Sequence, residues 1–560
     1  MTLERRAILA AVLMAALLVV YQAYFAPVPE SPTPREATKP ESQPKPEAVG
    51  EIPLLSARPA VPAAEAAPPP RTATIDGPLY RAVVSSEGGK LLEWTLRYRG
   101  EKPMVAIGEL GPLGLVLSVD GQGAGRVLPM ELTAESLQLS RGRPTGEVVL
   151  TGALDGLHVR QVLQFRADTY TIDVGILVEN RAPAPRTVGI ALPWRFHRHD
   201  KLPGERFPGQ WPTEVVWAGR DGRVDRIEDL TAVPARRLEG EWVAIGSTWY
   251  LAALIPKSPG FVLVMGSQAT GQGQGGGHEV QVAAGTSSTV APGERWEGRV
   301  LVYVGPKEYD RLRAYGLEGT LNFGGFPVPR KWGGLPMEWL GVPILRLMNW
   351  TYRYVGNYGV AIILLTIVSR ILFYPLTVRS VRSMKAMQAL QPQINALRAK
   401  YRNDPRKLQE ETLALYRKHR VNPMGGCLPM LAQIPIFYAL YLALSVSVEL
   451  QNAAFLCFGR IFGVDVWICD LASHDPTYVL PILMGVTMFI QQRMTPMAGD
   501  PRQQKVMLIM PFLFTFMFLN LPSGLVLYWT VSNLLQILQQ WWMDRPRAQD
   551  AREAKGAAKA

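Results

Sequence analysis

The C-terminal part of the chain carries five long apolar segments, and these limit its possible folds more than any other feature. A helix needs about 20 mostly apolar residues to cross the hydrocarbon core of a bilayer, at a rise of about 1.5 Å per residue. We therefore predict five membrane-spanning helices, at residues 356–378, 427–448, 478–493, 506–521 and 523–542. The sequence LPSG between the last two predicts a tight turn.

A sixth apolar segment stands near the N-terminus, where residues 7–26 carry no charge and follow two arginines. This pattern is typical of a secretory signal peptide or of an uncleaved signal anchor. A cleavage site needs small residues where this segment has Tyr21 and Tyr24, so we interpret 1–26 as a transmembrane anchor. Residues 27–71 then hold 13 prolines, which predicts an extended, disordered linker.

The middle of the chain, residues 72–305, consists of short alternating apolar runs such as VRQVLQFR and YTIDVGILVEN. Turn residues separate these runs, a pattern typical of a large antiparallel β-sandwich. His197 and His199 could share one face of a strand and bind a metal, but no third ligand follows at a recognisable spacing. A solvated or hydrogen-bonded surface is the simpler interpretation, and we identify no catalytic or metal site here.

A connector at residues 306–354 joins this region to the apolar segments. Apolar and aromatic residues recur at helical spacing over 335–352, where Glu338 and Arg346 interrupt them, and Arg353 follows. This pattern predicts an amphipathic helix that lies on the membrane surface.

Lysine and arginine are distributed unevenly among the loops. The loop 379–420 has 11 basic and three acidic residues, whereas the loop 449–477 has one basic and four acidic residues. Short basic loops remain in the cytoplasm. With six transmembrane helices this predicts a multi-pass protein of the cell inner membrane. Both termini, including a basic tail at 544–560, are then cytoplasmic, and the β-sandwich is periplasmic.

One arginine, Arg370, lies inside the first of the five segments, in AIILLTIVSRILFYPL. A charge at the centre of a spanning helix costs about 2.5–3.5 kcal/mol on insertion scales. Thr366 and Ser369 share its helix face by their spacing. Other candidate residues for the same site are Gln433, Phe437, Trp529, Ser532, Asn533 and Gln536. We predict a hydrated, positively charged groove open to the cytoplasm, because polar residues within a membrane face a bundle interior or water. The alternative is an arginine that extends to the interface or neutralises one buried carboxylate.

The basic loop is predicted to form a cytoplasmic helical hairpin over residues 380–420. An apolar stripe follows its first half, and RNDPRK at 402–407 separates it from a weaker second stripe. Pro392 should kink or loosen the first helix. The stripe residues that we single out are Met384, Met387, Leu390 and Ile394.

Four strings closely resemble the YidC family of membrane protein insertases: FYPLTVRSVRSMKAMQALQPQI, VNPMGGCLPMLAQIPIFYALY, DPTYVLPILMGVTMFIQQRM and LPSGLVLYWTVSNLLQILQQ. The resemblance covers residues 355–542. The anchor, linker and outer sandwich resemble the Gram-negative form, whose periplasmic domain is a β-supersandwich. The resemblance implies a five-helix insertase core at 355–543, with Arg370 as the groove arginine and Thr366 and Trp529 at other groove positions.

The resemblance also implies the function: a membrane protein insertase and chaperone that needs no cofactor. Its implied partners are nascent membrane proteins, the lipid bilayer, Sec translocon components, the ribosome and the signal recognition pathway. No GxxxxGK[ST] phosphate loop occurs in the chain. Two alternatives from other classes are a secondary transporter for an anionic solute and a membrane-anchored carbohydrate-active enzyme. Insertion of a short single-span substrate into liposomes would separate the three.

The chain has three cysteines, and two of them, Cys457 and Cys469, fall in the predicted outer loop. They lie in FLCFGRIFGVDVWIC, which looks like an insertion relative to the family. Because that compartment is oxidising, we predict a disulfide between them. The alternative is two small apolar residues that dip into the membrane interface.

Overall fold

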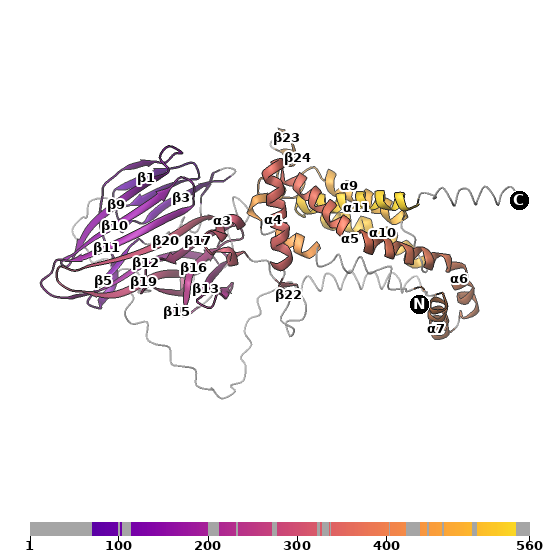
Figure 1. Cartoon of the computed structure of the whole chain (residues 1–560), viewed down its shortest axis with the longest axis horizontal. Coiled ribbons are helices and arrows are strands. Elements are labelled where there is room, and N and C mark those ends of the chain that lie inside the picture. The colour runs from indigo at the N-terminus through magenta and orange to yellow at the C-terminus, as the bar shows by residue number, and fades with distance from the viewer. Residues whose placement is uncertain are drawn as a thin grey trace, which may run out of the picture.

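The computed structural model describes residues 70–98, 101–103, 114–199, 212–230, 233–270, 277–321, 325–326, 335–336, 338–402, 404–419, 421, 437–444, 447–461, 464–494 and 501–544. The predicted N-terminal anchor, nearly all of the proline-rich linker, Gln433 and all but the first residue of the basic tail lie outside these ranges. Figure 1 shows a β-rich region at one end of the molecule and a helical region at the other.

The described strands of the β-rich region form three large sheets, which together we call the β domain. The nine-stranded sheet has the order β14 (Val224–Ile227), β13 (Glu214–Gly219), β16 (Gly240–Gly246), β17 (Tyr250–Pro256), β20 (Arg295–Pro306), β11 (Thr171–Asn180), β10 (Leu157–Arg166), β9 (Thr145–Leu154) and β7 (Glu131–Leu132). The six-stranded sheet has the order β15 (Arg236–Leu238), β18 (Val262–Thr270), β19 (Gly277–Val290), β12 (Arg186–His199), β5 (Val116–Val119) and β6 (Gln122–Val127). The five-stranded sheet has the order β4 (Glu101–Pro103), β3 (Leu91–Arg97), β2 (Tyr80–Ser85), β1 (Thr72–Asp76) and β8 (Ser136–Gln138).

The pairing within these sheets is antiparallel, as the alternating sequence pattern predicts, apart from the parallel pair β1–β8. Strand β10 illustrates the reason. Its apolar residues Leu157, Val159, Leu163 and Phe165 are buried, and polar residues alternate with them. Successive side chains of a strand point to opposite faces, so this alternation gives one apolar and one polar face. Burial of each large apolar side chain contributes about 1.5–3 kcal/mol.

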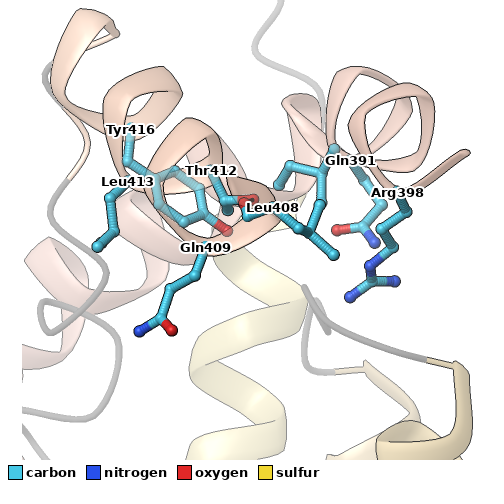
Figure 2. A pocket seen from close by; sticks show the side chains of 8 residues that line it. Gln391, Arg398, Leu408, Gln409, Thr412, Leu413 and Tyr416 are labelled. Carbon is cyan, nitrogen blue, oxygen red and sulfur yellow. Dashed lines mark hydrogen bonds between the residues drawn. The ribbon is translucent and has the colours of Figure 1, made fainter. Parts of the chain in front are cut away.

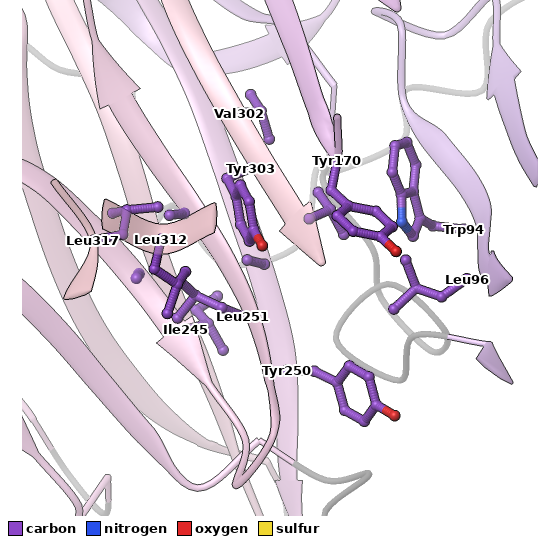
Figure 3. Close-up of a cluster of buried hydrophobic side chains, with 14 of the residues drawn as sticks. Trp94, Leu96, Tyr170, Ile245, Tyr250, Leu251, Val302, Tyr303, Leu312 and Leu317 are labelled. Atoms are coloured by element: carbon purple, nitrogen blue, oxygen red, sulfur yellow. The ribbon is translucent and has the colours of Figure 1, made fainter. Parts of the chain in front are cut away.

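The β domain continues into a short helix, α3 (Tyr309–Arg313), and a 3-10 turn, η1 (Glu318–Thr320). Figure 3 shows Leu312 of α3 and the following Leu317 in one cluster with Ile245 and Leu251 of the sheet. All four side chains are at most 1% exposed. The connector therefore begins as part of the β domain core.

The helical region contains α4 (Glu338–Val355), α5 (Tyr358–Ala389), α6 (Gln391–Lys400), α7 (Pro405–Lys418), a described helical segment at 437–444, α9 (Val479–Met494), α10 (Pro501–Phe518) and α11 (Ser523–Asp544). Two small strand pairs complete the described elements: β21 (Gly325–Phe326) with β22 (Leu335–Pro336), and β23 (Leu456–Ile461) with β24 (Val464–Ile468). A 3-10 turn, η4 (Val448–Leu450), precedes β23.

Among the described residues, α5 is the one helix that is long and apolar enough to cross a membrane by length and composition. The apolar helices at 479–494 and 508–518 are shorter. The six transmembrane helices therefore stay a prediction.

Helix α5 is longer than we expected. We predicted a span that ends near residue 378 and a separate hairpin helix from residue 380, but the helix is continuous to Ala389 and includes Pro375. Residues 379–389 contain no glycine or proline, so nothing in the sequence ends the helix before this point. The break instead falls at Leu390, two residues before Pro392, which occupies the first turn of α6. Proline is tolerated at that position because the first helical N–H groups have no partner within the helix.

The two regions are joined by specific contacts at the connector. Arg346 of α4 donates to the Tyr309 hydroxyl at 2.8 Å, and Arg353 pairs with Asp310 at 2.6 Å. The arginines that interrupt the amphipathic pattern of α4 thus bind α3.

Candidate functional site

The helical region places Arg370 between α5 and α11. Its Nε donates to Ser532 Oγ at 3.1 Å, its Nη1 donates to Gln536 Oε1 at 3.1 Å, and its Nη2 also donates to Ser532 Oγ. Ser532 and Gln536 are one helical turn apart on α11, so both side chains reach the same guanidinium. Three predicted site residues, distant in sequence, are thereby brought together.

The partners of Arg370 are neutral oxygens. The five apolar segments contain no Asp or Glu, and the hydrogen bonds given above are to a hydroxyl and an amide. Within the described part of the chain, these bonds orient the guanidinium without supplying a negative charge to it. They use three of its five N–H groups. The arrangement can therefore still attract and bind an additional anionic group.

Thr366 and Ser369 share the Arg370 face of α5, as their spacing predicts, but their hydroxyls bind their own helix. Thr366 Oγ1 donates to Ile362 O at 2.7 Å, and Ser369 Oγ donates to Thr366 O at 2.8 Å. A hydroxyl that donates to a carbonyl of the preceding helical turn is satisfied within its own helix. These two residues supply polarity near Arg370 without a direct contact to it.

A second polar contact links α11 to α9. Asn533 Nδ2 donates to Thr487 Oγ1 at 3.5 Å, and both residues are buried. Below it along α11, Gln540 Nε2 donates to the Met494 carbonyl. We did not identify Thr487 from the sequence. The available signal was a polar residue within an otherwise apolar segment, the same signal that identified Ser532.

Aromatic side chains lie next to the polar residues of α11. Trp529 packs edge-on against Phe437 with ring centroids 4.7 Å apart, and against Phe518 at 5.0 Å. Phe437 and Trp529 are thus in contact as two members of the predicted site. They provide an apolar wall one turn from Ser532, on the side away from Gln536.

The opposite surface of α5 is apolar and exposed. Ile371 and Leu372, the residues after Arg370, are 69% and 70% exposed. In a membrane protein such a surface faces lipid. The site therefore lies within one helix turn of an exposed apolar surface.

The hairpin helices α6 and α7 enclose a separate cavity of about 280 Å³, shown in Figure 2. Its lining is mixed: Gln391, Ile394, Arg398, Leu408, Gln409, Thr412, Leu413 and Tyr416. Of the predicted hairpin residues, Ile394 lines this cavity and Leu390 is buried beside it at the start of α6. Met384 and Met387 lie on the last turns of α5 and are half-buried.

Within the described ranges, no group of three or more His, Cys, Asp or Glu side chains is placed to hold a metal ion. The two outer cysteines form a disulfide: Cys457 and Cys469 have Cα atoms 4.6 Å apart, within the usual range for a bridge.

Comparison with known proteins covers nearly the whole chain. The family model described as 60Kd inner membrane protein matches residues 350–551, and the model described as YidC periplasmic domain matches residues 72–332.

Individual relatives match over their full length. Membrane protein insertase YidC of Nitratidesulfovibrio vulgaris (strain DP4) is 37% identical over 564 residues, which is 97% of this chain and 99% of that protein. The protein of the same name from Syntrophus aciditrophicus (strain SB) is 33% identical over 575 residues, covering 97% of this chain and 100% of that one. Among solved structures, an active YidC insertase with its first transmembrane domain resolved covers 88% of this chain and 95% of its own, at 21% identity and a TM-score of 0.36.

Proposed function

Because the chain belongs to the YidC family of membrane protein insertases, a family of inner-membrane insertion factors and not of enzymes, we propose that it inserts nascent membrane proteins through a polar site centred on Arg370. The observation that carries this proposal is the guanidinium held between α5 and α11 by Ser532 and Gln536, its hydrogen-bond partners among the described residues. The site would lie in a hydrophilic groove open to the cytoplasm and to lipid.

The proposed mechanism is electrostatic. Two unit charges 4 Å apart attract by about 4 kcal/mol at an effective dielectric constant of about 20. An aspartate at the centre of a bilayer costs about 2.5–3.5 kcal/mol on insertion scales. The attraction is as large as this cost, so a positive charge without a protein counterion can hold an acidic tail or loop halfway across the membrane.

The apolar part of the substrate would complete the reaction. The polar tail binds near Arg370, while the hydrophobic segment moves out past the exposed Ile371 and Leu372 into lipid. Burial of its apolar surface in lipid, at about 25 cal/mol per Å², drives this step. No covalent chemistry or nucleotide is required.

The same proposal includes the wider organisation of the protein. Six transmembrane helices, cytoplasmic termini and a periplasmic β domain agree with the distribution of basic residues among the loops. The hairpin formed by α6 and α7 would then face the cytoplasm, where a ribosome, a signal recognition component or a nascent chain arrives. Action as a chaperone, either alone or beside the Sec translocon, belongs to this proposal.

The test uses purified full-length protein in liposomes and two single-span substrates that differ only in tail charge, one acidic and one with Asn and Gln in its place. In the variant Arg370→Ala, the insertion rate of the acidic substrate should fall about tenfold or more, because the lost attraction exceeds about 1.4 kcal/mol. The insertion rate of the neutral substrate should fall less. Arg370→Lys should retain most of the activity, since it keeps the charge.

A matched control is Arg295→Ala, which removes an exposed arginine of β20 and should leave both substrates unaffected. Equal insertion of the acidic substrate by wild type and Arg370→Ala would refute the electrostatic role. Failure of the wild type to insert either substrate would refute autonomous insertion as a whole.

A further inference from the structure

The hairpin formed by β23 and β24 carries apolar side chains that the rest of the described structure leaves exposed. Phe458 is 68% exposed and Leu456 is 39% exposed. The two residues lie close together on β23, whose register with β24 is irregular between Cys457 and Arg460. Phe458 also stacks on Trp467 of the partner strand, with ring centroids 6.1 Å apart and an interplanar angle of 12°.

The backbone holds this aromatic pair in an unusual conformation. Trp467 has a φ angle of 68°, in the left-handed region that bulky residues rarely adopt. The disulfide between Cys457 and Cys469 closes the same end of the hairpin, because Cys457 is paired with Trp467 in the strand register. The two aromatic rings are thus fixed in place next to a covalent bridge.

The base of the hairpin is attached to the first turn of α5. Asn357, the N-cap of α5, donates from Nδ2 to the Phe455 carbonyl at 3.1 Å. The Phe455 ring packs so closely on Gly359 that an added Cβ there would lie 2.1 Å from it. The hairpin therefore has a defined position relative to the end of this helix.

The length of the apolar part of α5 places this end of the helix at the edge of a bilayer that would cover it. From Tyr358 to the residue before Arg379, the helix is apolar apart from Arg370 and a few hydroxyls. This stretch is about 31 Å long at a rise of about 1.5 Å per residue, which equals the thickness of the hydrocarbon core, about 30 Å. A membrane that covers it has its boundary at Asn357 and hence at the base of the hairpin.

Two other parts of the helical region also expose apolar side chains. Tyr478, directly before α9, and Val479, Ile482, Leu483 and Val486 of α9 are between 41% and 55% exposed. Helix α4 exposes Trp350 and Tyr354, which are 57% and 77% accessible. Figure 1 shows β23 and β24 at the same end of the helical region as α4, away from α6 and α7.

We propose that the disulfide-closed hairpin inserts Phe458 and its neighbours into the interfacial layer of the leaflet at the N-terminal end of α5. Aromatic side chains favour that layer, because their apolar rings tolerate partial burial at the level of the headgroups. The hairpin carries one basic and one acidic residue, Arg460 and Asp465, which are paired in register. Its binding therefore depends on apolar contact and does not require anionic lipid. Together with α4, it anchors the outer end of the helical region in the plane of the membrane.

The test places a photoreactive p-benzoylphenylalanine in Phe458's position in the full-length protein, reconstituted in vesicles of phosphatidylcholine alone. After illumination, mass spectrometry of the protein measures phospholipid adducts. The same residue at Ile482 of α9 is the positive control, because this side chain is 55% exposed on a lipid-facing helix. The same residue at Leu92 of β3 is the negative control, because this side chain is 42% exposed on the β domain.

We expect adducts at position 458 several-fold above those at position 92 and comparable to those at position 482. Adding anionic lipid should leave the yield unchanged. A yield at 458 no higher than at 92 would overturn the proposal, as would adducts formed only with protein, which would assign this face to a protein partner. Circular dichroism and thermal melting of each variant establish that the substituted chains are folded.

Discussion

A buried cation in the β domain and one in the helical region have different kinds of bonding partner. In the β domain, Lys307 is 2% exposed in its side chain and bonds Glu214 Oε1 at 2.8 Å, while Arg226 binds the other carboxylate oxygen at 3.1 Å. In the helical region, Arg370 is bound by the hydroxyl of Ser532 and the amide of Gln536. Lys307 thus pairs with a carboxylate that it shares with Arg226, whereas Arg370 is bonded to neutral dipoles among the described residues.

This difference in partners indicates different roles for Lys307 and Arg370. A buried ion pair completes its own electrostatics, so it stabilises an arrangement of strands but attracts nothing further. Burial lowers the pKa of the Lys307 ammonium, and the Glu214 carboxylate opposes this change. A cation held by dipoles alone keeps a long-range attraction for anions, since dipoles orient a charge without cancelling it. The predictions below alter these two arrangements in turn.

The largest effect is expected from breaking the paired cation. Glu214→Gln leaves the buried Lys307 ammonium without its carboxylate partner, and loss of one member of a buried pair costs about 3–5 kcal/mol. The measurement is denaturant unfolding of the full chain in detergent. The matched control is Asp173→Asn, which breaks the exposed pair with Arg299 and should cost about 0–1 kcal/mol. Equal losses for both variants would contradict a special role for the buried pair.

The next effect comes from giving the unpaired cation a counterion. In Gln536→Glu, a carboxylate replaces the amide whose oxygen lies 3.1 Å from Arg370 Nη1. We expect insertion of an acidic-tailed substrate to fall about tenfold, or about 1.4 kcal/mol, because the new carboxylate competes with the substrate. Gln536→Met, which removes the same amide without adding a charge, is the control and should have a smaller effect. An unchanged rate for Gln536→Glu would mean that an uncompensated charge is not needed.

A smaller effect concerns a carboxylate between the two regions. Burial raises the pKa of Glu449 above its ordinary value, and the nearby Glu308 charge raises it further, while bonds from Ser447 and Asn349 oppose the change. A raised pKa in the folded state means that stability is greatest below the ordinary carboxyl pKa of about 4.3 and is lost as pH rises through the folded-state value. Glu449→Gln should therefore reduce the pH dependence of the melting temperature and stabilise the protein at neutral pH relative to wild type.

The control for this prediction is Glu297→Gln, which replaces an exposed carboxylate of β20. Melting curves at pH values from about 4 to about 8 would check it. A pH profile of Glu449→Gln that coincides with wild type would remove Glu449 as the source of the dependence.

The smallest effect is expected from removal of most of the β domain. Deletion of residues 78–300 removes the sheet residues on which α3 packs but none of the residues that bind Arg370, which belong to α11. The insertion rate of a simple single-span substrate should change by less than about threefold. A tenfold change would correspond to a loss of about 1.4 kcal/mol. Complete loss of insertion by a stably expressed deletion would show that the two regions act as one unit.

Much of the secondary structure of this protein could be predicted from the sequence, because the periodic patterns that indicate strands and helices are local. Alternating runs such as that of β10 predicted an antiparallel sheet region, and apolar segments such as that of α5 predicted long helices. The match of the chain to the YidC family likewise follows from strings that can be read directly. Composition also located Arg370, since one charge within an apolar run is visible without any structure.

Only the tertiary structure decided which groups meet. The sequence places Ser532 and Gln536 more than 160 positions from Arg370, and no local pattern states that their oxygens bind its guanidinium while the Thr366 and Ser369 hydroxyls turn back to their own helix. The sequence also does not show that Phe455, at the base of the β23–β24 hairpin, packs on the first turn of α5. The physical reason is that periodicity reports which side of an element is apolar, whereas hydrogen bonds and close packing depend on the rotation and distance of elements that are far apart in the chain.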